Sequence, residues 1–143
     1  MRIKLKKKQV FTLILAALLL ALNFTMRYGV WKKVQRYNLD KTRYEKLALA
    51  HHLGGEAGID YELKNLVKHD PSAAGFVRQT SARIKAAKDA RLFIKSSIEG
   101  DNDKITHLKT NRFILSGIIY IVLACQALLN IRYWWKDNRR PPQ

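Results

Sequence analysis

The stretch FILSGIIYIVLACQALLNI, residues 113–131, decides the fold of this chain. Its nineteen residues include no charged side chain. At ~1.5 Å per residue, a helix of that length matches the ~30 Å hydrocarbon core of a bilayer. Arg112 comes directly before the stretch. The cations and aromatic residues typical of a membrane interface come directly after it, and they predict interfacial anchors for a transmembrane helix: Arg132, Tyr133, Trp134, Trp135 and Lys136.

A second apolar run, VFTLILAALLLALNFTM, occupies residues 10–26 and follows a basic segment. The same order of segments is found in cleavable secretory signals. However, seventeen residues are more than most signals contain in their apolar part. No convincing A-x-A cleavage site follows Ala21 either, because Leu22 and Asn23 come next. We therefore expect a retained transmembrane helix.

The distribution of charge predicts the orientation of these two spans. Five of the first eight residues are basic and none is acidic, which favours a cytoplasmic N-terminus. Two spans then return residues 132–143, which are also basic, to the same side. The first span is expected over residues 10–28, with Tyr28 and Trp31 as interfacial anchors at its far end. These features predict an integral protein of a bacterial inner membrane with both termini in the cytoplasm.

The predicted fold is an all-α membrane protein in which two transmembrane helices flank a small helical extramembrane region. Its parts are a basic cytoplasmic N-terminus, the first span, a helical extracytoplasmic region, the second span and a basic cytoplasmic tail, at residues 1–9, 10–28, 29–112, 113–131 and 132–143. The 27 Lys and Arg outnumber the 11 Asp and Glu, giving a net charge of +16. Such an excess favours anionic partners. The single cysteine, Cys125, lies inside the second span and excludes an intramolecular disulfide.

Between the spans the apolar residues recur with helical spacing, and no stretch alternates as a strand does. Residues 38–40 predict a break, and a following helical stripe ends at Gly54 and Gly55. A short helix is then expected from Asp60.

A long basic amphipathic helix is predicted near residues 71–99, with Asp70 as its N-cap and Pro71 in its first position. A turn is expected at residues 100–103. The cations of this helix could contact anionic lipid or an acidic protein, or simply form a solvated face: Arg78, Arg83, Lys85, Lys88, Arg91 and Lys95. Nucleic acid is the least expected partner, because no aromatic residues alternate with these cations.

Polar residues inside the spans predict contact between helices. Asn23, Gln126 and Asn130 interrupt otherwise apolar sequence, and polar side chains in lipid usually face another helix. For Asn23 and Asn130 an alternative is that they lie near the head groups and reach water. Gln126 lies nearer the middle of its span.

An antiparallel pair of spans aligned near Leu18 and Val122 would bring these polar residues together. Asn23 would then lie beside Ser116 and level with Gly117, and Gln126 or Asn130 would come near Thr12. Small residues at the contact would let the backbones approach closely. The residues expected to pack in this way are Ala17, Ala21, Asn23, Gly117, Ala124 and Gln126.

The sequence offers no motif for catalysis, a cofactor or a metal. His51 and His52 are neighbours on a predicted helix and point about 100° apart, so they do not form a chelating pair. His69 and His107 are isolated in the sequence. No phosphate loop, nucleophile elbow or pair of carboxylates in a predicted cleft is present. We therefore expect a protein that is not an enzyme and that holds no cofactor.

Three classes of function agree with these features. The first is a non-catalytic accessory or assembly subunit that packs against other integral membrane subunits and contacts anionic lipid or an acidic protein. The second is a sensor-like module in which the helices that connect the two spans bind a ligand and relay the signal through the membrane to a separate signalling partner. The third is a small lysis, immunity or exclusion protein. The sequence leaves open whether the chain forms a homo-oligomer.

Overall fold

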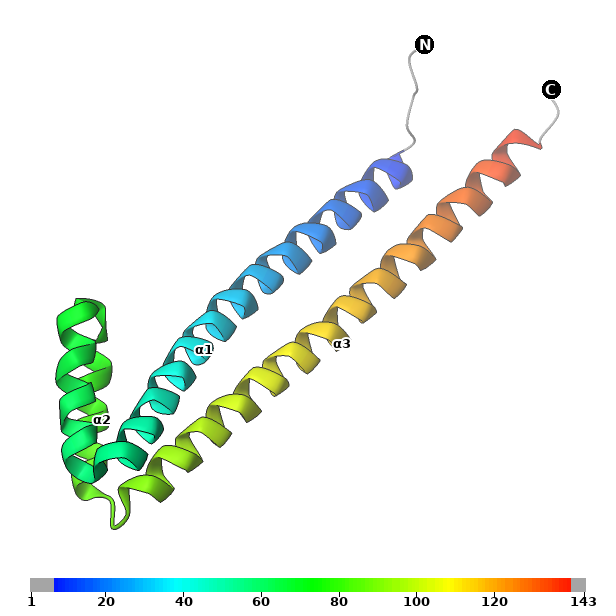
Figure 1. Ribbon diagram of the computed structural model, residues 1–143. Coiled ribbons are helices and arrows are strands. Elements are labelled where there is room, and N and C mark those ends of the chain that lie inside the picture. The colour runs from blue at the N-terminus through cyan, green and yellow to red at the C-terminus, as the bar shows by residue number, and fades with distance from the viewer. Residues whose placement is uncertain (1–6, 140–143) are drawn as a thin grey trace. The chain divides into compact units, whose positions relative to one another are not determined.

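The computed structural model describes residues 7–139, except for the side chains at positions 137 and 138. Within this range the elements are α1 (Lys7–His69), the 3-10 helix η1 (Pro71–Ala73), α2 (Ala74–Ala86) and α3 (Ala90–Asn138), as Figure 1 shows. The predicted all-α class is confirmed, since two long apolar helices of 63 and 49 residues are joined by a short helix. Parts of the predicted N-terminus and tail, residues 1–6 and 140–143, lie outside the described residues.

The chain divides into two compact units. We call them the terminal unit (Met1–Trp31 with Lys109–Gln143) and the central unit (Lys32–Leu108). In the terminal unit the first part of α1 and the last part of α3 lie side by side (Figure 1). Both helices are long and apolar enough to cross a membrane, and only 6% and 0% of their most apolar windows are buried within the protein. Length and composition thus make both helices candidate membrane spans.

A stripe of less exposed residues runs along each helix of the terminal unit. The spacing alternates between three and four residues, which is the pattern of helices that pack at a shallow left-handed crossing. On α1 the stripe consists of Thr12, Ala16, Leu19, Asn23, Met26 and Val30. On α3 it consists of Arg112, Ser116, Ile119, Leu123, Gln126 and Asn130.

In the central unit, α1 continues through residues 38–40, so the predicted break is wrong. The backbone carbonyl of Asn38 and the side chain of Asp40 both have partners about one turn later in the same helix. The hydroxyl of Thr42 donates to the carbonyl of Asn38 at 2.9 Å, and Asp40 pairs with Arg43 one turn later at 3.3 Å. Turn-forming residues therefore remain helical where neighbours at i+3 and i+4 bond to them.

The predicted break at Gly54 and Gly55 is confirmed. Gly55 has φ 60° and ψ −144°, a conformation that glycine adopts readily and other residues rarely do. The segment after it lies very close to the segment before it, since a Cβ at Gly58 would be 2.2 Å from the carbonyl oxygen of Ala50. Gly55 and Gly58 together allow the two segments of α1 to pack against each other.

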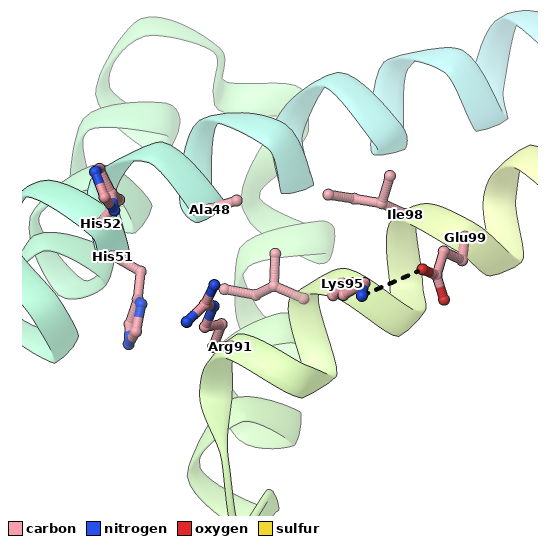
Figure 2. Close-up of a pocket in the computed structure, with 8 residues that line it drawn as sticks. Ala48, His51, His52, Arg91, Lys95, Ile98 and Glu99 are labelled. Carbon is pink, nitrogen blue, oxygen red and sulfur yellow. Dashed lines mark ion pairs between the residues drawn. The ribbon is translucent and has the colours of Figure 1, made fainter.

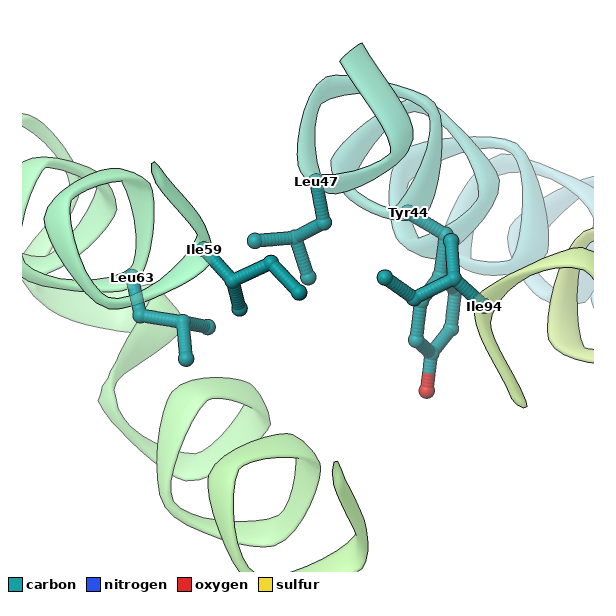
Figure 3. Packing of buried hydrophobic residues seen from close by; sticks show 5 residues of the cluster. All are labelled: Tyr44, Leu47, Ile59, Leu63 and Ile94. Atoms are coloured by element: carbon teal, nitrogen blue, oxygen red, sulfur yellow. The ribbon is translucent and has the colours of Figure 1, made fainter. Parts of the chain in front are cut away.

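The core of the central unit draws on α2, on α3 and on the segments of α1 before and after Gly55. Leu47 is 0% exposed and packs with Ile59 and Leu63 from beyond Gly55 (Figure 3). Ile94 joins them from α3. Tyr44 belongs to the same cluster, and its ring makes edge-to-face contacts with two other rings. The ring centroids are 5.0 Å apart for Phe76 of α2 and 6.3 Å apart for Phe93 of α3. Burial of these large side chains is the main stabilising contribution to the unit.

The predicted long helix near residues 71–99 is wrong, because this range forms η1, α2 and the start of α3. The N-cap is confirmed, since Asp70 accepts a hydrogen bond from the amide of Ser72 at 3.0 Å and proline follows it. The helix α2 ends at Ala86, and its C-cap residue Ala87 has an extended backbone. Asp89 then caps α3 by accepting from the amide of Arg91 at 2.8 Å. The break lets α2 and α3 both direct apolar side chains into one core.

The predicted turn at residues 100–103 is also wrong, because α3 is helical there. Asp101 is buried on the inner side of the helix and pairs with Lys104 at 3.5 Å. Spacing of acid and base by three residues supports the helix, whereas the local cluster of Gly, Asp and Asn predicts a turn.

The approach at Gly58 predicts a large effect of adding one methyl group. Gly58→Ala is expected to destabilise the protein by ~1–3 kcal/mol. The added Cβ would clash with the backbone carbonyl of Ala50, so the two segments of α1 would have to move apart. Gly100→Ala is the matched control, since that helical position has open space and should gain ~0.5–1 kcal/mol. Thermal unfolding of both variants in lipid nanodiscs, followed by circular dichroism, measures the difference. Equal stability of the two variants would contradict the close approach.

Candidate functional site

The terminal unit contains a seam of polar side chains between its two helices. Asn23 is 4% exposed, and its carboxamide makes two contacts with α3. The hydroxyl of Ser116 donates to Asn23 Oδ1 at 2.8 Å, and Asn23 Nδ2 donates to the hydroxyl oxygen of Tyr120 at 3.3 Å. The predicted proximity of Asn23 to Ser116 is confirmed. Tyr120 is an additional partner that the spacing argument missed, since its long ring reaches the same carboxamide.

A second polar contact lies nearer the ends of the chain. The hydroxyl of Thr12 is 3.3 Å from Asn130 Oδ1, which confirms the predicted contact between these two positions. It also lies 2.9 Å from the carbonyl oxygen of Gln9 in its own helix. One turn away, Gln126 has a buried Oε1 without a hydrogen-bond partner among the described residues. By the register of the neighbouring contact Gln126 lies opposite Ala16, which has no side-chain donor.

The predicted small-residue contact between the helices is largely wrong. Ala17, Ala21 and Ala124 are exposed, and only Gly117 of the four is half-buried. The reason is helical geometry, because Ala21 stands two residues from Asn23 and is therefore turned about 200° away from the inner stripe.

The interfacial aromatic residues are all exposed. Tyr28 and Trp31 stack on each other with ring centroids 6.0 Å apart, and the guanidinium of Arg139 lies 4.5 Å from the ring centre of Trp135. Tyr133 and Trp134 share this exposure. Anchoring of these rings at a membrane interface stays a prediction.

The predicted basic surface does not form one helix face. Arg78, Arg83 and Lys85 lie on α2, Lys88 lies in the connection, and Arg91 and Lys95 lie on α3, all of them exposed. The break before α3 separates the two groups. Arg83 lines a polar cleft, whereas Arg91 and Lys95 line a different pocket.

A buried arginine joins the elements of the central unit. The side chain of Arg43 is 9% exposed and pairs with Asp70 at 2.8 Å and with Asp40 at 3.3 Å. Its guanidinium also lies 5.2 Å from the ring centre of Phe76. The hydrogen bonds from Ser72, and then that from Arg43, hold the pKa of Asp70 below its usual value. The sequence shows no signal for this junction, because its members are 27 residues apart.

A polar cleft of about 260 Å³ lies beside this junction in the central unit. Asp101, one of the two acidic residues that line the cleft, is 7% exposed. Burial raises the pKa of its carboxyl, and the nearby charge of Lys104 partly lowers that pKa again. The ammonium of Lys104 lies 5.3 Å from the ring centre of Tyr37. The lining includes further hydrogen-bonding side chains: Asp40, Gln79, Thr80, Arg83, Ser96 and Ser97.

A second pocket of about 540 Å³ in the central unit lies between the histidine-bearing part of α1 and the start of α3 (Figure 2). We call it the histidine pocket, after His51 and His52. Ala48, Ile94 and Ile98 supply its apolar residues, and Arg91, Lys95 and Glu99 supply its charged ones. Within residues 7–139, His, Cys, Asp and Glu form no group of three or more that could hold a metal ion.

Comparison with known proteins gives no relative from which to transfer a function. No protein-family model matches the chain, and neither a curated protein nor a solved structure matches it significantly. What the fold defines is an all-α chain with two candidate membrane spans and a helical central unit.

The polar seam predicts measurable coupling between the two candidate spans. A double-mutant cycle of Asn23→Leu and Ser116→Ala should give a coupling energy of ~0.6–2 kcal/mol, because their hydrogen bond joins two helices. Leu22→Ala paired with Ser116→Ala is the control and should give no coupling, since Leu22 is exposed. Unfolding in mixed micelles provides the free energies. Additive effects in both cycles would contradict the contact.

The raised pKa of Asp101 predicts a pH-dependent difference in stability. The folded chain holds this proton more tightly than the unfolded one, whose value is near 3.8. The stabilising effect of protonation is therefore present below that value and is lost as pH rises through the folded pKa. Asp101→Asn, which resembles the protonated form, should unfold at a higher temperature than the wild type at neutral pH. The difference should disappear in acid.

Thermal unfolding of both proteins across this pH range tests the prediction about Asp101. Asp103→Asn is the control, because Asp103 is exposed two residues further along α3. A lower unfolding temperature of Asp101→Asn at neutral pH would mean that the pair with Lys104 outweighs burial.

Proposed function

We propose that this protein is a non-catalytic accessory or assembly subunit of a larger membrane complex, located in a bacterial inner membrane with both termini in the cytoplasm. The observation that carries the proposal is the exposure of the two apolar helices, whose most apolar windows are 6% and 0% buried. A narrow seam holds the helices together, and the large apolar side chains outside it need lipid or another protein.

Inside the polar seam, Asn23 and Asn130 contact the facing helix, whereas the buried Oε1 of Gln126 has no partner among the described residues. Because this oxygen is enclosed within the chain, a donor from another protein would not reach it. The exposed apolar side chains outside the seam are therefore the surface that the proposed partner would cover.

The central unit contributes a second contact in this proposal. Its exposed cations on α2 and at the start of α3, together with the net charge of +16 of the whole chain, favour an acidic protein surface or anionic head groups. Such contacts are sensitive to salt, whereas packing of the spans is not.

A sensor-like module is the second candidate function. The histidine pocket favours it, because a pocket of about 540 Å³ lies within the size range of small-molecule sites, roughly 300–1,000 Å³. In this alternative the central unit binds a ligand and a separate partner carries the signal.

Co-purification from native membranes in a mild detergent tests the proposed subunit role. A partner in stoichiometric amount is expected, and the variant Arg78→Gln with Lys85→Gln should recover less of it, by roughly threefold or more at low salt. Lys64→Gln with Lys68→Gln is the matched control, since it removes two exposed charges from another segment. A protein that emerges alone at every salt concentration would exclude the subunit role.

A further inference from the structure

We propose that the histidine pocket binds an amphipathic anion, namely an acyl chain that ends in a carboxylate or a phosphate. This inference is independent of the proposed subunit role, because it uses residues of the central unit alone. It assigns a ligand class to a pocket whose apolar and charged residues come from two different helices.

The apolar residues of the pocket are fixed by the core beneath them. Ile94 is 1% exposed and belongs to the central cluster, and Ala48 and Ile98 are half-buried against the same cluster. Ile94 lines the pocket but is almost fully covered, so the exposed sides of Ala48 and Ile98 supply the apolar surface. Packing holds both side chains from within, so this surface is preformed. An acyl chain is the complementary partner, since it removes this surface from water.

The charged residues of the pocket favour an anion. Lys95 is 3.9 Å from Glu99, so these two largely offset each other. The guanidinium of Arg91 makes no ion pair or hydrogen bond with the described residues. His51 and His52 line the same pocket from α1, and His51, which extends on the side of Arg91, can donate a hydrogen bond (Figure 2). The planar donor set of a guanidinium matches a carboxylate or phosphate in two-point contact.

Arg91 is the second residue of α3, whose first turn contains no acidic residue. The backbone amides of Arg91 and Leu92 donate to the carboxylate of Asp89, which therefore already occupies this end of the helix and offsets its dipole. A bound anion at this end of the pocket would be stabilised by the guanidinium of Arg91. A neutral lipid or a short anion would satisfy only one part of the pocket.

Photolabelling of the full-length protein in phosphatidylcholine nanodiscs tests this inference. The probe is a twelve-carbon fatty acid that carries a diazirine, and mass spectrometry locates the labelled residues. Labelling is expected around Ala48 and Ile98. Laurate or lysophosphatidic acid should compete, whereas dodecanol and acetate should not. The more effective competitor distinguishes a free carboxylate from a lipid phosphate as the natural source.

Variants separate a specific site from general partitioning into the nanodisc. Arg91→Gln should reduce labelling of the pocket roughly tenfold, because a charge-assisted contact is lost. Its unfolding temperature should match the wild type, since the guanidinium makes no ion pair with the residues that the structure describes. Arg78→Gln, which removes a cation outside the pocket, should label normally. Equal labelling of Arg91→Gln and wild type, or equal competition by dodecanol, would overturn the proposal.

Discussion

The central unit depends on the approach of the Gly58 backbone to the carbonyl oxygen of Ala50. The carbonyl oxygen of Ala50 is 2.2 Å from the position that a Cβ at residue 58 would occupy, so any residue other than glycine would force the backbone to move. The positive φ of Gly55 turns the chain just before this point. Leu47 can then pack against Ile59 and Leu63 within one core. The histidine pocket and the polar cleft both use residues that precede this turn, so their shape depends on the same constraint.

The terminal unit follows a different physical logic. In the membrane location that we propose, apolar packing alone would give little preference for one helix pair over another, because hydrocarbon tails are as apolar as the side chains. The directional contacts of Asn23 and Thr12 with α3 therefore define the register of this pair. The stripe with alternating spacing of three and four residues keeps those contacts in line along both helices.

Charge is distributed unevenly within the central unit. Arg43 is buried and fully paired, which makes it structural, whereas Arg91 is exposed and makes no pair with the described residues. Asp101 is a buried acid with a raised pKa, and Asp70 is a half-buried acid whose pKa is held down by its hydrogen bonds. These contrasts separate residues that hold the elements together from those that remain for a ligand or partner.

The sequence by itself determined the helical class, the two apolar stretches, the break at Gly55, the Asp70 cap and the register of Asn23 with Ser116. Each of these follows from local composition or from fixed helical geometry. Only the tertiary structure decided that residues 38–40 stay helical, that the predicted helix near 71–99 divides at Ala87, and that Asp101 is buried. Those outcomes depend on contacts between residues far apart in the chain. The histidine pocket belongs to the same group, because Arg91 lies about forty residues from His51 and meets it only when the segments pack.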